Sequence, residues 1–155
     1  MSTSKTIQDS AQRIAGERHA GIVIKDGKIL LVHRIKNGYE YHVFPGGHRR
    51  EGELGQNTVI REILEETSMS VTNPKLVFEF KDYKNNNTDY YYFCTWVSGD
   101  QPKLNGEEAL ADPKLNFYGP MWVSLNEIGS LNILPKFAKF WLQDYLDKYS
   151  ANFSQ

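Results

Sequence analysis

The sequence predicts an α/β fold in which a mixed β-sheet lies between helices, as an α/β/α sandwich. Strand-like runs joined by tight turns open the chain, an amphipathic helix is expected at 54–68, and further strands precede a terminal helix. This order of elements is typical of a sheet that is covered on both faces. The 155 residues, 40% of them apolar, suit a single domain spanning residues 1–155.

The composition and the charge balance exclude several classes of protein. Lysine and arginine together number 18 and the acidic residues 19, which leaves a net charge of −1. This balance argues against binding nucleic acid or a membrane surface through bulk positive charge. No apolar run approaches the roughly 18 residues of a membrane-spanning helix. The N-terminus also lacks a secretory signal, so we expect a cytoplasmic protein.

The first residues of the chain suggest a helical extension to the domain. Ile7, Ala11 and Ile14 recur at helical spacing, so their side chains would share one face of a helix. We therefore expect a helical extension within residues 1–16, with a short amphipathic helix at 3–16.

Two turn signals predict hairpins in the next part of the chain. Asp-Gly at 26–27 and Asn-Gly at 37–38 each separate two β-rich runs, which is a strong hairpin signal. The strand after the second turn is expected to stop at Pro45. Residues 47–53, with the sequence GHRREGE, are then expected to form a loop.

The C-terminal half is expected to supply more strands and two helical segments. Phe137, Trp141 and Tyr145 recur every four residues, which favours core packing by a terminal helix that begins after Pro135. Cys94, the only cysteine, lies in an aromatic run and is interpreted as a small buried hydrophobe. The other elements are expected as strands at 70–82 and 89–98, a polar loop at 99–117, a strand at 118–125 and a short helical segment at 126–131.

The helix expected at 54–68 carries the most informative pattern. At about 100° per residue, Glu62, Glu65 and Glu66 share an arc of about 100°. Arg61 lies beside Glu65 on the same wheel. The remaining arc is expected to face the core through Val59, Ile60, Ile63, Leu64 and Thr67.

The simplest interpretation of three glutamates on one arc is a solvated acidic face. Two effects count against it, since like charges one turn apart repel by about 0.2–0.5 kcal/mol per pair. Anions in the last turn of a helix are also disfavoured by about 0.3–1 kcal/mol each. A divalent cation reverses both effects, and carboxylates are ligands that Mg²⁺ and Mn²⁺ prefer.

The segment before this helix complements its acidic face. Gly46 and Gly47 permit a close approach of the backbone to a ligand. His48, Arg49 and Arg50 place positive charge within a few residues of the glutamates. A metal together with arginine is a combination suited to holding phosphates.

From Gly47 to Met69 the sequence resembles the Nudix box, the signature of the MutT-like Nudix hydrolases. That box is a glycine, five residues, a glutamate, seven residues, then Arg-Glu-aliphatic-x-Glu-Glu-x-Gly-aliphatic. Ser68 stands where the family has glycine, which bears on the end of the helix and not on its carboxylates. The order of the surrounding elements also resembles the family's α/β/α sandwich. The matching positions are Gly47, Glu53, Arg61, Glu62, Ile63, Glu65, Glu66 and Met69.

The resemblance implies a hydrolase that uses Mg²⁺ or Mn²⁺ to cleave the diphosphate linkage of a nucleoside diphosphate derivative. It implies that Arg61 orients a glutamate and that Glu53 supports the helix and the metal network. Glu65 is the first choice of general base, and Glu108 in the polar loop is an additional carboxylate that stands as the alternative. The metal ligands implied are Glu62, Glu65, Glu66 and the backbone carbonyl of Gly46.

Residues outside and inside the box are expected to contact the substrate. Arg18 and Arg34, near strand ends, are candidate phosphate contacts. Phe44 and His42 are candidates for the border of a base or sugar pocket, although Phe44 fits the core equally well. The substrate-binding candidates are therefore Arg18, Arg34, Phe44, Gly47 and Arg49.

Several assignments stay open at the level of the sequence. The substrate is a nucleoside triphosphate, an oxidised nucleotide, or a compound of the nucleotide-sugar or ADP-ribose type. The alternative is a catalytically inactive, nucleotide-binding regulatory module, although the box keeps every carboxylate. A phosphorylated-terpenoid isomerase shares the fold, but no active-site cysteine lies around the box. The expected partner is a small-molecule nucleotide, with no nucleic acid or membrane, and a homodimer is the candidate assembly.

Overall fold

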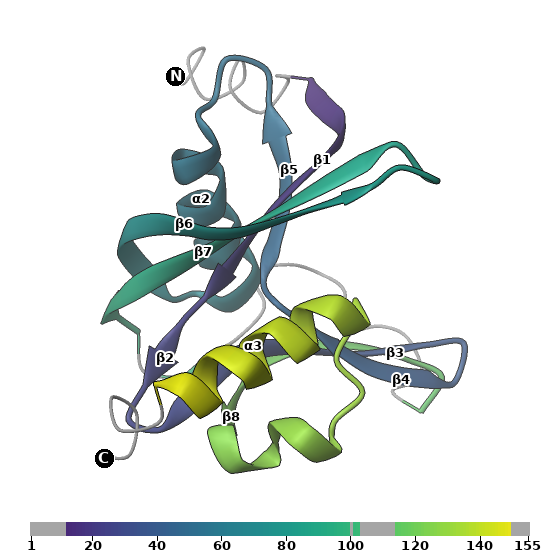
Figure 1. Cartoon of the computed structure of the whole chain (residues 1–155), viewed down its shortest axis with the longest axis vertical. Helices are drawn as coiled ribbons and strands as arrows, with labels where there is room; N and C mark the ends of the chain where they lie inside the picture. Colours follow the sequence, from purple (N-terminus) through teal and green to yellow (C-terminus); the bar gives the residue numbers. More distant parts are fainter. Residues whose placement is uncertain (1–11, 100, 103–113, 150–155) are drawn as a thin grey trace, which may run out of the picture.

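The computed structural model describes residues 12–99, 101–102 and 114–149 (Figure 1). The strands of its N-terminal part are β1 (Arg13–Ile22), β2 (Ile24–Lys25), β3 (Lys28–Lys36), β4 (Tyr39–Val43) and β5 (Gly46–Arg50). Helix α2 (Gly55–Thr67) follows them. The chain continues through β6 (Ser70–Asp82), β7 (Asn87–Ser98), β8 (Asn116–Ser124), the 3₁₀ helix η2 (Leu125–Ser130) and α3 (Lys136–Lys148).

The strands form two four-stranded sheets. Sheet A has the order β5-β1-β7-β6, and it is mixed because β1 and β7 run parallel while its other pairs are antiparallel. Sheet B is antiparallel, with β3 paired to β2, β4 and β8. The expected mixed sheet between helices is therefore confirmed, but its strands are shared between two sheets, which the order of elements did not indicate.

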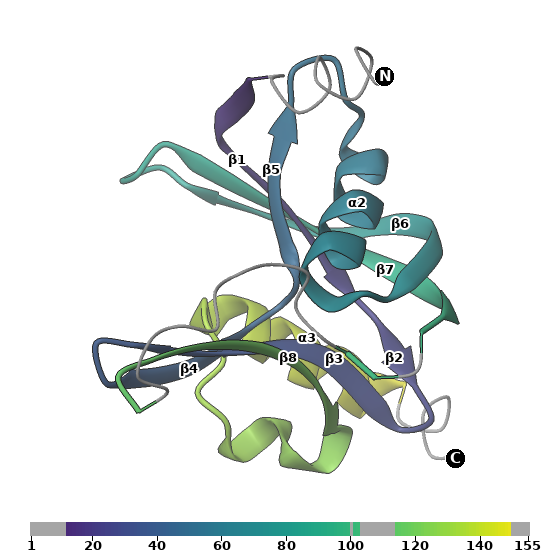
Figure 2. The same ribbon diagram turned by 180° about the vertical axis from the view of Figure 1, so that it is seen from behind.

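Two hydrophobic cores lie on opposite faces of the strands. Tyr91 belongs to the core packed under α3, whereas the next residue, Tyr92, belongs to the core packed under α2. Leu30 and Leu31 of β3 divide in the same way. Successive side chains of a strand point to opposite faces. The two views accordingly show α2 and α3 on opposite sides of the sheets (Figures 1 and 2).

The N-terminal part of the chain corrects two expectations. Residues 13–16, expected in a helix, belong to strand β1, where Gly16 takes a φ of 76° and the register with β5 shifts. Residues 1–11 of the expected extension lie outside the described residues. Residues 47–50, expected to begin a loop, belong to β5, because the edge of β1 pairs with them at His19↔Gly47. The two hairpin turns at 26–27 and 37–38 are confirmed.

The C-terminal elements follow the sequence pattern closely. The strand at 70–82 has the expected bounds, and the helix after Pro135 is present as α3. Trp141 of α3 stacks on Phe78 at 5.1 Å between ring centroids. Cys94 is buried, and burial raises the pKa of its thiol to about 12. No helix in the described part of the chain is long and apolar enough to cross a membrane.

Helix α2 is turned slightly from its predicted orientation. Val59, Ile63 and Thr67 are buried as expected, but Leu64 is 46% exposed and Glu62 is only 7% exposed. The helix meets β1, β5 and β6 along the arc of Thr58, Val59, Glu62, Ile63 and Thr67. The buried face is therefore shifted around the helix toward Glu62 and away from Leu64, so that it includes a carboxylate.

This orientation predicts different effects for two neighbouring aliphatic residues. Ile63→Ala leaves a cavity against sheet A and is expected to lower the free energy of unfolding by about 2–5 kcal/mol. Leu64→Ala removes an exposed side chain and is expected to cost less than about 1 kcal/mol. Urea denaturation followed by circular dichroism measures both values. Equal losses would mean that α2 faces the sheet as the sequence alone suggested.

Candidate active site

The first carboxylate of the site, Glu62, lies between α2 and strand β5. Its side chain accepts a hydrogen bond from Arg61 Nη1 at 2.8 Å and packs directly over the backbone of Gly47. A Cβ at position 47 would collide with the Glu62 carboxylate, so only glycine permits this approach. Gly47 therefore serves here as the surface against which a buried carboxylate is held.

Glu66 lies one turn further along the same face of α2. Its Oε2 accepts a hydrogen bond of 3.3 Å from the Gly46 N–H, and its carboxylate also bonds the hydroxyl of Tyr118 on β8. Burial raises the pKa of Glu66 to about 7; the positive charge of Arg18 opposes this shift, and the negative charge of Glu62 adds to it. The protein thus holds a carboxylate whose charge is not fully compensated by its described neighbours.

Arg61 joins the acidic groups into one network. Its Nε donates to Glu53 Oε2 at 2.8 Å, and its Nη2 donates to Glu53 Oε1 at 3.0 Å, a bidentate pairing. Its Nη1 is shared between Glu62 Oε1 and Glu65 Oε2, at 2.8 and 3.2 Å, and Nη2 also donates to the His48 carbonyl at 3.2 Å. The contact between Arg61 and Glu65 is the one that the helical wheel indicates.

Glu53 supports the start of α2 from the preceding turn. Burial alone would raise its pKa, but hydrogen bonds from Arg61, from the Thr58 hydroxyl and from the Arg50 N–H lower the pKa to about 2. Glu53 is therefore a fixed anion that holds the guanidinium of Arg61. Its supporting role, expected from the resemblance, is consistent with these contacts and stays a prediction.

Glu65 differs from the other two glutamates of the helix. Its side chain is 48% exposed, and besides Arg61 it faces Arg50, whose Nη2 lies 3.8 Å from Glu65 Oε1. Within the described ranges, no three His, Cys, Asp or Glu side chains are arranged to hold a metal ion. The pair of buried Glu62 and half-buried Glu66 nevertheless fits a hard divalent cation, since it offers oxygen donors and an uncompensated charge.

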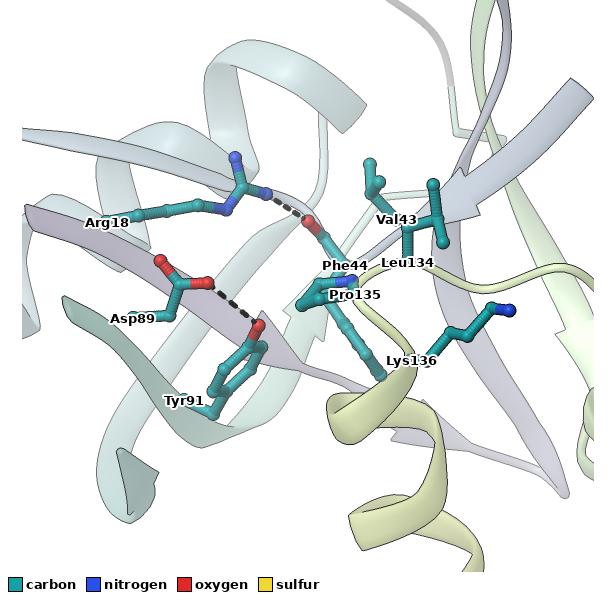
Figure 3. A pocket seen from close by; sticks show the side chains of 8 residues that line it. All are labelled: Arg18, Val43, Phe44, Asp89, Tyr91, Leu134, Pro135 and Lys136. Carbon is teal, nitrogen blue, oxygen red and sulfur yellow. Dashed lines mark hydrogen bonds between the residues drawn. The ribbon is translucent and has the colours of Figure 1, made fainter. Parts of the chain in front are cut away.

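Beside Glu66, Arg18 forms the wall of a cavity of about 570 Å³ (Figure 3). Its Nη2 donates to the Phe44 carbonyl at 2.7 Å, which holds the guanidinium at the cavity wall. Asp89 and Tyr91 of β7 lie on the same side, and Phe44 contributes to both the cavity and the core. The opposite side is formed by Val43, Leu134, Pro135 and Lys136.

Arg34 lies on the face of sheet B that carries Tyr118. Its guanidinium carbon is 5.0 Å from the centre of the Tyr118 ring and 5.8 Å from that of Tyr41. Its Nε is buried and has no hydrogen-bond partner among the described residues. An unpaired donor next to the tyrosine that bonds Glu66 makes Arg34 available to an acceptor such as a phosphate oxygen.

The remaining candidates are placed differently. Arg49, expected to contact the substrate, makes two hydrogen bonds to the Glu17 carboxylate, at 3.0 and 3.2 Å, and does not line the cavity. His42 is buried and stacks on His33 with 4.6 Å between ring centroids, also outside the cavity lining. Glu108 lies outside the described residues. No signal in the sequence marked Tyr118 or Asp89, because neither belongs to a spaced motif.

Comparisons with known proteins identify the family and the fold of this chain. Residues 16–147 match the family model described as the NUDIX domain. An uncharacterized Nudix hydrolase of Bacillus subtilis, YvcI, is 33% identical over 114 residues, which are 71% of this chain and 66% of that protein, just under two thirds of its length.

Two solved structures show the same fold. One, described as MutT from Aliivibrio salmonicida and Vibrio cholerae, has a TM-score of 0.61 at 20% identity and covers 85% of this chain and 98% of its own. The other, an ADP-ribose pyrophosphatase from Streptococcus suis, has a TM-score of 0.57 at 18% identity and covers 76% of this chain and 78% of its own.

The low pKa of Glu53 predicts a pH dependence of stability. Its folded value of about 2 lies below the ordinary 4.5, so its contribution is complete above pH 4.5 and is lost as the pH falls toward 2. By linkage this contribution is up to about 3 kcal/mol. Glu53→Gln is expected to flatten the stability profile between about pH 5 and pH 2, in chemical denaturation at each pH. Glu51→Gln changes an exposed glutamate and is the control; an identical flattening there would contradict the assignment.

Proposed function

We propose, given that this chain belongs to the Nudix hydrolase family, that it is a divalent-metal-dependent hydrolase of a nucleoside diphosphate derivative. The observation that carries the proposal is the position of Arg18. Its guanidinium interacts with Glu66 of α2 and also lines a cavity of about 570 Å³. That volume is in the range of small-molecule sites, roughly 300–1,000 Å³. A nucleoside in the cavity would therefore extend its phosphates toward the glutamates.

The phosphates would be held by the two arginines that face this region. Arg18 already donates one hydrogen bond to Phe44, which orients its remaining N–H groups. Arg34 offers a buried Nε that has no partner in the part of the chain that the structure describes, and its two tyrosine neighbours restrict the plane of the guanidinium. Guanidinium groups bind phosphate oxygens bidentately, which positions the diphosphate bond as well as neutralising it.

Glu62 and Glu66 would hold the divalent cation, with Glu65 as a third ligand or as the base. A bound cation supplies neutralisation of phosphate charge and a lowered pKa for bound water. In this proposal Glu65 accepts the proton of the attacking water, since it is the exposed carboxylate and stays hydrogen-bonded to Arg61. The water oxygen bonds to phosphorus and the diphosphate bridge breaks, with the leaving phosphate carrying away the bridging oxygen.

The substrate class that this chemistry supports is a nucleoside diphosphate linked to a second group. Two similar structures carry different names, MutT and ADP-ribose pyrophosphatase. The catalytically inactive module is the competing function, and it would bind the same ligand through the same cavity. The intact set of carboxylates favours the enzyme.

The direct test is a hydrolysis assay on nucleoside triphosphates, oxidised nucleotides, ADP-ribose, dinucleoside polyphosphates and nucleotide sugars. Each is supplied with Mg²⁺ or Mn²⁺, and released phosphate is measured with and without a coupling phosphatase. We expect turnover on one class and none when a chelator is present. Nucleotide binding by calorimetry without turnover on any substrate would instead support the regulatory module.

Replacing the glutamates separates catalysis from binding. Glu65→Gln and Glu66→Gln keep the shape of the side chain and remove its charge, so each is expected to lower kcat by about 100-fold or more with the fold retained. Glu79→Gln changes an exposed glutamate of β6; it is the matched control and should keep wild-type turnover. Near wild-type activity in both helix variants would rule out the assigned roles, and circular dichroism checks the fold.

Arg18→Gln tests the contact to phosphate. Loss of a charge-assisted hydrogen bond is expected to raise KM by about tenfold or more. Arg13→Gln removes an exposed arginine from the same strand and should leave KM unchanged. An equal rise in both variants would indicate attraction by overall charge instead of a specific contact. Steady-state kinetics on the best substrate of the panel measures both.

A further inference from the structure

A second cavity lies apart from the glutamates, where β2, β6, β7 and the end of α3 meet. Its volume is about 450 Å³, and it shares no lining residue with the cavity at Arg18. Aromatic side chains form much of its surface, through Phe93 and Trp96 of β7 and Tyr145 of α3. None of these residues takes part in the proposed hydrolysis.

The polar groups that line this cavity are mostly hydrogen-bond donors. Lys25 and Lys75 contribute ammonium groups from two different strands, and the described lining contains no carboxylate. The Nζ of Lys25 lies 3.8 Å from the centre of the Trp96 ring. Its nearest carboxylate, that of Asp26, is a highly exposed group at 3.7 Å. For Lys75, no described carboxylate lies within ion-pair distance.

Trp96 adds a donor that the described part of the chain does not satisfy. Its Nε1 is buried and has no hydrogen-bond partner among the described residues. An indole N–H can only donate, so the group needs an acceptor that the described residues do not supply. Because Trp96 lines the cavity, a ligand bound there would lie against the indole ring.

We propose that this cavity is a second binding site, for a small ligand that carries a phosphate group. At neutral pH the oxygens of a phosphate group are acceptors, apart from one titrating proton. They match a lining that offers the ammonium groups of Lys25 and Lys75, the side-chain amide of Asn73 and the indole of Trp96. The aromatic surface suits a planar group attached to it. Inorganic phosphate and a nucleoside monophosphate share this chemistry, and they are distinguished by titration.

The test follows the indole N–H signal of Trp96 in two-dimensional ¹H–¹⁵N spectra. The chain has three tryptophans, so Trp96→Phe identifies the signal by its disappearance. Inorganic phosphate, pyrophosphate and AMP are titrated separately into the full chain without divalent cation. The result is then independent of hydrolysis at the glutamates, and its failure leaves the proposed function standing.

We expect the Trp96 signal to shift and saturate with at least one probe. Lys75→Gln should weaken that binding by about tenfold, the effect of losing a charge-assisted contact. Lys81→Gln removes an exposed lysine from the same strand, at the same cost in net charge, and should change the affinity by less than about twofold. Saturation by phosphate alone assigns the site to the free anion, and saturation only by AMP assigns it to a mononucleotide. No shift with any probe, or equal weakening in the two lysine variants, overturns the proposal.

Discussion

The guanidinium of Arg61 is the interaction on which the rest of the site depends. It is bound by Glu53 from the turn before α2, by Glu62 and Glu65 from its own helix, and by the His48 carbonyl from β5. Partly buried arginine can hold several carboxylates because it is always charged and has five donors. Without it, the carboxylates on this side of α2 would repel one another across a half-buried surface. Arg61 therefore determines which carboxylate oxygens remain for a cation or a water molecule.

Charge is distributed unequally over the acidic face for the same reason. Glu62 and Glu65 each share Arg61, whereas Glu66 makes no direct contact with it and is held by Gly46 and Tyr118. Burial of a carboxylate without a paired cation is unfavourable, and the raised pKa of Glu66 expresses that cost. Of the three glutamates, Glu66 is therefore the one whose negative charge is least compensated by Arg61, and it interacts instead with the charge of Arg18, which lines the cavity. The net charge of −1 for the whole chain does not reveal this local imbalance of charge.

The sequence predicted α2 and its acidic face because helical periodicity depends only on local spacing. It misplaced Leu64 and Glu62 because the rotation of a helix about its axis depends on what it packs against. Here the partner is the bare backbone of Gly47. The sequence does not reveal that residues 47–50 form a strand, because they pair with β1, which is far away in the sequence. The contact of Arg49 with Glu17 is hidden for a related reason, since the two residues are 32 positions apart; the substrate contact of Arg49 stays a prediction.

Strand β1 fixes the position of the cavity relative to helix α2. Arg18 points to the cavity, and the next residue, His19, points to the α2 side, as alternation requires. His19 is buried, stacks on Tyr90 at 4.7 Å, and bonds Tyr92 and Glu17 through its two ring nitrogens. The backbone at the first residue of α2 packs directly on this ring. One strand in the middle of sheet A therefore fixes both the arginine at the cavity and the start of the glutamate helix. A shift of β1 by one residue would turn Arg18 toward α2 and His19 toward the cavity. The position of Arg18 relative to the glutamates is therefore set by the register of the sheet and not by the loops.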